Sequence, residues 1–382
     1  MIPSQTEGLF FVYFIINTMT IEKIITALED FAPLAYQEEY DNCGLLAGDK
    51  NWEATGALLT LDCTEEIIEE AIQNKCNLVI AHHPIIFSGL KKITGATYIE
   101  RTLIKAIKND IAIYACHTNL DNMKQGVNKK IAEKLGLENL KILAPKQHHL
   151  KKIVVFIPTI HHEKVLEALF IAGAGNIGNY SNCSFNLEGS GTFKGNDLSK
   201  PFIGRPNELS REKEIRTEVI FESAQQGKII SALLKAHPYE EVAYDIYRLD
   251  NGYQGIGSGM VGDLKAGMNV MDFLNHVKKT FKVPSIKHTK SWEKEIKKVA
   301  ICGGSGRFLL KNAIQSGADA FITSDFKYHE FFDAENKLLV VDTGHYESEQ
   351  FTPEIFYDII QKKFTTFAIH LSKINTNPIN YF

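Results

Sequence analysis

The sequence predicts an α/β protein built from two similar α/β halves, with a ferredoxin-like α+β insert between them. Three observations predict this fold. Short apolar strands alternate with amphipathic helices in residues 19–148, and the same alternation returns in residues 253–382. Residues 149–252 follow a different order of strands and helices. In addition, a chain of 382 residues is too long for one ordinary hydrophobic core.

The composition is that of a folded globular protein, with 44% hydrophobic and 23% charged residues. The formal net charge of -4 gives no general attraction to nucleic acid or to an anionic membrane, so we expect neither as a partner. The six cysteines are scattered without a C-x-x-C pair. This pattern indicates reduced thiols and a cytoplasmic protein, and it argues against a disulfide framework or a thiolate zinc site.

Residues 1–18 are interpreted as an N-terminal extension that the fold does not need. Their apolar run, residues 9–16, is too short to span a bilayer and lacks the features of a secretory signal. A second methionine, Met19, opens the first amphipathic helix of the chain.

The first half should begin with a helix over residues 20–31, which have apolar side chains at helical spacing and stop before Pro33. Thr64 is a good N-cap, and the acidic residues that follow it favour a helix over residues 65–74. The other expected elements are strands at residues 57–62, 77–81 and 111–116 and helices at residues 98–109 and 126–135, with Ile99, Leu103 and Ile107 facing inward on the helix at 98–109.

The insert should contain two β-α-β units in succession, which is the order of a ferredoxin-like domain. The expected strands are residues 153–158, 218–221 and 242–248, and the expected helices are residues 162–172 and 224–235. Residues 173–195 are rich in Gly, Asn and Ser, and we interpret them as a flexible loop.

The second half repeats the layout of the first, although no repeat is visible residue by residue. Helices are expected at residues 271–281, 307–316 and 328–334, and strands at residues 298–302, 320–323 and 338–341. Residues 303–306, Gly-Gly-Ser-Gly, predict a tight turn whose amides could face an anionic substrate. Pro353 at a helix start confines the preceding turn to a few residues and places the last helix at 353–363.

Polar side chains follow several of these strands at the point where each strand ends. They are His82 and His83, His117 and Asp121, Asp325 and His329, and His345 and Glu349. If the residues after Gly344 are helical, His345 and Glu349 lie four apart on one helix face. Neutral imidazoles and carboxylates from several segments are what a divalent ion requires, and two ions need a carboxylate that bridges them. The coincidence of these residues at strand ends favours a metal site.

Each residue also has a structural explanation. His82 and His83 could form a turn, with one imidazole bound to a backbone carbonyl. Asp121 could be an N-cap or an Asx turn, and His117 a buried histidine with satisfied hydrogen bonds. Lys327 could neutralise a phosphate, but it could equally be a solvated lysine.

Three motifs, VIAHHPIIF, HTNLDN and GHYESE, occur in this order and flank the insert. They resemble the GTP cyclohydrolase 1 type 2 homologue family, the NGG-interacting-factor-like dinuclear metal proteins. The resemblance covers about residues 19–371 and implies two divalent metal ions per chain. It implies five ligands, with Glu349 as the bridge: His82, His83, Asp121, His345 and Glu349. It also implies that His117 lies next to the ligands or shuttles protons. Zinc, iron, manganese and nickel all suit this donor set.

The resemblance further implies a toroidal homohexamer, with the insert as a PII/CutA-like module over the openings of the ring. Together with the donor set it predicts a metal-dependent hydrolase that acts on a small molecule, a nucleotide or another phosphorylated compound, with GTP ring opening as the named candidate. In this role His117 or His329 would move protons. The alternative is a non-catalytic metal-binding regulatory or scaffold protein that holds protein or nucleic acid within the ring.

Overall fold

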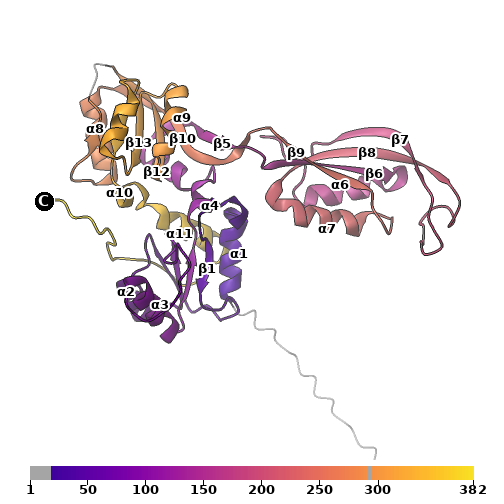
Figure 1. Cartoon of the computed structure of the whole chain (residues 1–382), viewed down its shortest axis with the longest axis horizontal. Helices are drawn as coiled ribbons and strands as arrows, with labels where there is room; N and C mark the ends of the chain where they lie inside the picture. The colour runs from indigo at the N-terminus through magenta and orange to yellow at the C-terminus, as the bar shows by residue number, and fades with distance from the viewer. Residues whose placement is uncertain (1–18, 291–293) are drawn as a thin grey trace, which may run out of the picture.

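The structure is a computed structural model that describes residues 19–290 and 294–382. Two α/β units pack against each other, and a third unit extends away from them to the right in Figure 1. The expected extension, residues 1–18, lies outside the described residues. None of the helices in the described part of the chain is long and apolar enough to cross a membrane.

The first α/β unit has a five-stranded sheet in the order β1-β4-β3-β2-β15, parallel except for β1. Its strands are β1 (Gly44–Ala47), β2 (Ala57–Thr60), β3 (Leu78–Ala81), β4 (Ala112–Ala115) and β15 (Ile369–Leu371). Helices α2 (Glu65–Gln73) and α3 (Tyr98–Lys108) cover its outer face. The Thr64 side chain accepts a hydrogen bond from the amide of Ile67, which confirms the predicted N-cap.

The second unit has a six-stranded sheet in the order β11-β14-β13-β12-β10-β5, in which β14, β13 and β12 are parallel. Its strands are β5 (Leu137–Lys146), β10 (Tyr253–Met268), β11 (Lys287–His288), β12 (Ile296–Ser305), β13 (Ala320–Ser324) and β14 (Leu339–Asp342). The short helix α9 (Leu310–Gln315) packs on its outer face.

A layer of helices between the two sheets joins the units through one continuous core. It consists of α1 (Ile21–Phe31), α5 (Val127–Leu135), α8 (Val270–Phe281) and α11 (Thr352–Lys363). The parallel strands are buried on both faces: Leu59 and Ile80 face this layer, whereas Leu58 and Val79 face the outer helices. The two sheets are therefore held in a defined relation to each other.

Two strands cross the expected division of the chain. The C-terminal strand β15 pairs with β2 of the first sheet, and β5, which precedes the insert, pairs with β10 of the second. The division at residues 148 and 253 stays a prediction, but the sheets do not follow it strictly. A three-residue strand such as β15 carries no pattern that shows its partner.

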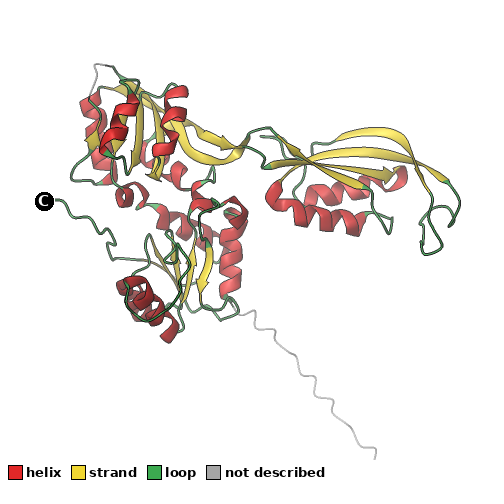
Figure 2. Ribbon diagram, viewed as in Figure 1, coloured by secondary structure: helices red, strands yellow, loops and turns green. Residues whose placement is uncertain are grey.

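The insert is a four-stranded antiparallel sheet in the order β7-β8-β6-β9, with two helices on one face, as Figure 2 shows. Its elements are β6 (Leu150–Pro158), α6 (His162–Ile171), β7 (Phe185–Phe193), β8 (Ser210–Glu222), α7 (Gln226–Ala236) and β9 (Tyr244–Leu249). This is the predicted ferredoxin-like order. The insert stands at the end of the antiparallel ribbon formed by β5 and β10.

Two local predictions are wrong. Residues 173–195, expected to be a loop, contain β7, in which Gly189 and Gly191 interrupt the alternation of apolar and polar residues. Ile107, expected to face inward, is 55% exposed because it lies on the solvent side of α3. The helix expected at residues 328–334 is present with these bounds, as the 3₁₀-helix η5 (Tyr328–Ala334).

Candidate metal centre

The candidate ligands lie at the carboxyl ends of parallel strands from both sheets. His82 and His83 follow β3, and Asp121 ends α4 (Thr118–Asp121), the short helix after β4. His345 and Glu349 begin and end α10 (His345–Glu349), which follows β14. Carboxyl ends of parallel strands are where ligand sites gather in α/β proteins. Here two such edges contribute to a single cluster.

Glycines allow the close packing around α10. Gly344, with φ of 93°, makes the sharp turn from β14 into α10. At Gly304, with φ of 61°, a Cβ atom would lie 2.4 Å from Oε1 of Glu349. A side chain at position 304 would therefore displace the Glu349 carboxylate.

Glu349 stands between two groups of donor atoms. Its Oε2 lies 3.0 Å from Nε2 of His83 and 3.1 Å from Nε2 of His345. Its Oε1 lies 3.7 Å from Nε2 of His82, which in turn is 3.5 Å from Oδ1 of Asp121. Each carboxylate oxygen thus faces a different group, which is the arrangement that a bridging ligand requires.

The other ring nitrogens are held by hydrogen bonds that aim Nε2 into the cluster. Nδ1 of His82 lies 2.9 Å from the carbonyl oxygen of Cys116. Nδ1 of His83 lies 2.8 Å from Oδ1 of Asp62, and Nδ1 of His345 lies 2.7 Å from Oδ2 of Asp325. Metal-binding histidines are usually oriented in this way, by a carboxylate or a carbonyl behind the ring.

The donor set fits divalent metal ions. Nε2 of His82 and Oδ1 of Asp121 are buried and have no hydrogen-bond partner among the described residues. Burial, together with the negative charge of Glu349, raises the pKa of the Asp121 carboxyl to about 7. An orphaned imidazole nitrogen and a destabilised carboxylate that face each other are both satisfied by a bound cation.

The histidines near Glu349 are strongly basic in this arrangement. Burial lowers the pKa of His83, but hydrogen bonds to Asp62 and Glu349 outweigh it and raise the pKa to about 9. His345 responds in the same way to Asp325 and Glu349, and its pKa rises to about 11. Without another cation, protons on these rings balance the buried carboxylate. A divalent ion would replace those protons.

His117 lies beside the ligands, and His329 does not. Nδ1 of His117 lies 2.9 Å from Oδ1 of Asp41, and His117 forms a third group of close donor atoms with His82 and His83. His329 is exposed on η5, where its ring contacts Tyr328. The structure thus brings together His117 and all five predicted ligands, and it leaves His329 outside the cavity lining.

Two kinds of residue near the site were missed by the sequence reasoning. One is the pair of carboxylates that orient histidines, Asp41 and Asp62; Asp62 follows β2, so the strand-end signal used for the ligands applies to it as well. The other is the C-terminal strap, residues 372–382. Oγ1 of Thr376 donates to Oδ2 of Asp62 at 2.6 Å, and Nδ2 of Asn377 donates to Oε1 of Glu347 at 2.9 Å. No pattern in the sequence shows this contact.

A cavity of about 540 Å³ opens onto the cluster. His83, His117, Asp121, His345 and Glu349 all line it, and part of the C-terminal strap forms its wall. Its size is that of a pocket for a small organic ligand.

The fold and the site together define a class of protein: two α/β units that bring histidine and carboxylate side chains together in a cluster suited to metal ions. The chain belongs to the Duf34/NIF3 (NGG1p interacting factor 3) family, whose model matches residues 19–378. This confirms the resemblance drawn from the three motifs.

Relatives and solved structures agree with this assignment. A Bacillus subtilis protein named GTP cyclohydrolase 1 type 2 homolog is 41% identical over 366 residues, or 94% of this chain and 98% of that protein. A protein of the same name from Halalkalibacterium halodurans is 40% identical over 365 residues, with the same coverage. The crystal structure of a Bacillus cereus protein related to NIF3 matches with a TM-score of 0.83 and 40% identity, over 95% of this chain and 99% of that one.

Proposed function

We propose that the chain holds two divalent metal ions at this cluster and is a metal-dependent hydrolase of a small molecule. The observation that supports this most is Glu349, because its two oxygens face two separate groups of donors. Two ions bound there would supply a water molecule of lowered pKa and polarise the group that is attacked.

The protein's own contribution is to orient the ligands and to move protons. Asp41 holds Nδ1 of His117, and this leaves Nε2 of the same ring to accept or donate a proton in the cavity. His117 is therefore our candidate for proton transfer. His329 is exposed and lies outside the cavity lining, so the structure does not support a role in proton transfer for it.

The proposed substrate is a nucleotide or another phosphorylated small molecule. The names of the Bacillus subtilis and Halalkalibacterium halodurans relatives make opening of the GTP ring the first reaction to test.

The test is hydrolysis of a panel of nucleotides and nucleosides by the metal-loaded protein, compared with Glu349→Gln, after elemental analysis of both. We expect two ions per chain in the unmodified protein and fewer in the variant, and turnover only in the former. Turnover that survives loss of the ions would refute the hydrolase proposal. Two bound ions without turnover of any compound would favour the alternative, a regulatory or scaffold protein.

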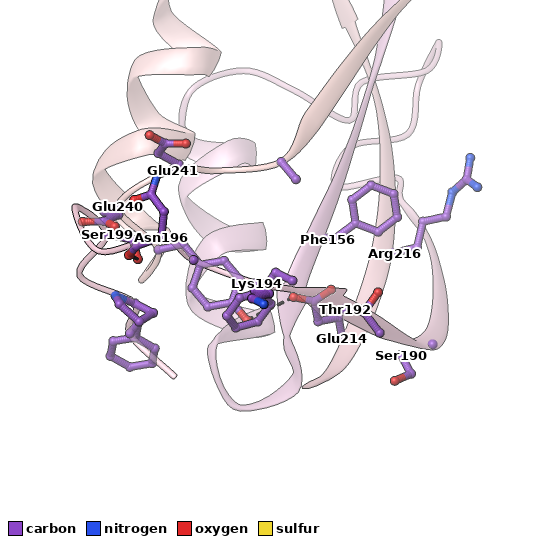
Figure 3. Close-up of a pocket in the computed structure, with 18 of the residues that line it drawn as sticks. Phe156, Ser190, Thr192, Lys194, Asn196, Ser199, Glu214, Arg216, Glu240 and Glu241 are labelled. Atoms are coloured by element: carbon purple, nitrogen blue, oxygen red, sulfur yellow. Dashed lines mark hydrogen bonds between the residues drawn. The ribbon is translucent and has the colours of Figure 1, made fainter. Parts of the chain in front are cut away.

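We also propose a homohexamer in which the insert is a PII/CutA-like module over the openings of the ring. Support comes from the face of the insert sheet that has no helices. It carries a hollow of about 1080 Å³, whose lining includes Phe156 and Arg216 (Figure 3). Strand β7 is an edge strand of this sheet, paired only with β8 among the described strands, and carries exposed Phe185 and Leu187. Neighbouring subunits usually cover such surfaces. Sedimentation of the protein and of Leu187→Glu would test this, with a smaller assembly expected for the variant.

A cytoplasmic location is also proposed. All six cysteines lie in the described part of the chain, and each is a free thiol there. Free thiols are typical of reducing compartments. Localisation of the tagged protein by fractionation would test this.

A further inference from the structure

The mouth of the metal cavity is lined by exposed aromatic rings. Phe87 and Phe308 belong to its lining and are 52% and 62% exposed, and Tyr40, also in the lining, is 65% exposed. Phe87 is the last residue of the VIAHHPIIF motif after β3, whereas Phe308 follows β12, so the rings reach the cavity from both α/β units. The ring centroids of Tyr40 and Phe87 are 6.3 Å apart. Exposed aromatic faces at a cavity mouth are suited to stacking on a flat ring.

No lysine or arginine is among the described residues that line this cavity. The closest basic partner of a lining residue is Lys146, whose Nζ lies 2.7 Å from Oε1 of Glu38 and is thereby committed to an ion pair. Lys327, considered from the sequence as a phosphate partner, is exposed and lies outside the lining. Phosphate sites usually depend on such cations, because they form charge-assisted hydrogen bonds.

The backbone amides that could have bound an anion are already used within the protein. The Gly-Gly-Ser-Gly segment, expected to be a tight turn, lies mostly at the end of β12. In it, the amide of Gly303 donates to Asn128, that of Gly304 to Ser348 and that of Gly306 to Thr323. The expectation that this turn faces an anionic substrate is wrong for these three amides, because side chains from neighbouring elements satisfy them.

Carboxylates outnumber the positive charges that two ions would bring. Three carboxylates stand behind histidine rings and two face the cluster directly: Asp41, Asp62, Asp325, Asp121 and Glu349. Their five negative charges exceed the four positive charges of two divalent ions. The loaded cluster therefore has no surplus charge with which to attract a triphosphate.

We infer that the ligand of this cavity is an uncharged, flat heterocycle of nucleoside size, recognised through its ring and not through phosphate groups. The inference rests on the proposed function, since it takes the cavity to be the substrate site. It keeps the hydrolase reaction but replaces phosphorylated compounds, as the substrate class, by uncharged compounds in which the ring carries the binding energy. Rings from both units clamp the ligand over the metal cluster.

The experiment measures equilibrium binding to the zinc-loaded, full-length protein by calorimetry at physiological ionic strength. The probes are guanosine, adenosine and uridine, each paired with its 5′-monophosphate, together with inorganic phosphate. We expect at least one nucleoside to bind as tightly as its monophosphate or more tightly, and inorganic phosphate not to displace it. Phe87→Ala and Phe308→Ala should each weaken that binding at least fivefold.

Phe332→Ala is the matched control, because Phe332 is 66% exposed and lies on η5, outside the cavity lining. It should bind as the unmodified protein does. A monophosphate that binds tenfold more tightly than its nucleoside would overturn the inference, and so would failure of all three nucleosides to bind. Unchanged affinity in both cavity variants would overturn it as well. These outcomes are separate from the hydrolase proposal, which depends on bound ions and turnover.

Discussion

Replacement of Asp325 by asparagine should weaken one of the two proposed metal sites without disturbing the fold. Asp325 has φ of 62°, and asparagine is the residue that best tolerates this left-handed conformation after glycine. The change keeps the size of the side chain and an oxygen acceptor, but it removes the charge 2.7 Å from Nδ1 of His345. What is lost is therefore the electrostatic support of one metal-binding ring.

The magnitude follows from the exposure of the pair. Removal of a group that orients a metal-binding histidine typically costs about 10–100-fold in metal affinity, or about 1.4–2.8 kcal/mol. The His345 and Asp325 side chains are 38% and 47% exposed, so water screens part of the interaction. We therefore expect a loss of about tenfold, the lower end of that range.

This loss is measured by titrating the zinc-loaded protein with a competing chelator of known zinc affinity, which gives the affinity for each of the two equivalents of zinc. One equivalent should weaken and the other should change little, because His82 and Asp121 do not contact Asp325. Asp110→Asn is the matched control, since Asp110 also has a positive φ, 52°, and lies at the end of α3 away from the cluster. If Asp325→Asn bound both equivalents as tightly as the control, the assignment of His345 as a metal ligand would fail.

The remaining predictions address the strap, the core and pH. Thr376→Val should lower the affinity for one metal equivalent about fivefold, which is the value of one ordinary hydrogen bond, because Thr376 holds Asp62 and Asp62 orients His83. Thr376→Ser keeps the hydroxyl and should restore that affinity in the same titration. Phe356→Ala should lower the free energy of unfolding in urea by about 3–5 kcal/mol, because Phe356 is fully buried between the two sheets. Tyr357→Ala is the control, and it should lower the free energy of unfolding far less, because Tyr357 is 37% exposed. Hydrogen bonds from the side chain and amide of Thr94 lower the pKa of Glu100 to about 2 from its ordinary 4.5, so its stabilising contribution is present above pH 4.5 and is lost as the pH falls toward 2. The unfolding free energy of Glu100→Gln, measured between pH 5 and 2.5, should accordingly fall less steeply than that of the unmodified protein.

The clustering of the candidate ligands could be predicted because its signal is local. Each follows a short apolar strand, and His345 and Glu349 needed only one helical turn to face each other, which α10 provides. Asp325, which was also a strand-end candidate, lies beside the cluster and orients His345, but the same reasoning failed for His329, four residues further along. The left-handed backbone of Asp325 prevents a continuous helix, and η5 begins only at Tyr328, so the two side chains do not share a face.

What could not be predicted depends on contacts between distant segments. Glycine at residues 189 and 191 interrupts the apolar alternation of strand β7, and its side chains are mostly exposed on both faces. Pairing with β8, and not burial, therefore orders this strand. The contact of Thr376 with Asp62 joins residues 314 positions apart. The contact depends on the pairing of β15 with β2 of the first sheet. A strand of three residues is too short for its sequence to indicate that pairing.

The path of the chain after Glu349 explains why the two halves should not bind metal well alone. Glu349 belongs to the second unit through α10, yet the next elements, α11 and β15, pack in the shared core and pair with β2 of the first sheet. The C-terminal strap follows β15, and its Thr376 binds Asp62. Asp62 in turn orients His83, which Glu349 contacts. A metal ion at His83, His345 and Glu349 would therefore be held by both units, while a single continuous segment fastens those units together. Binding of the ion and closure of the interface should accordingly stabilise each other, since each holds the same three side chains in place.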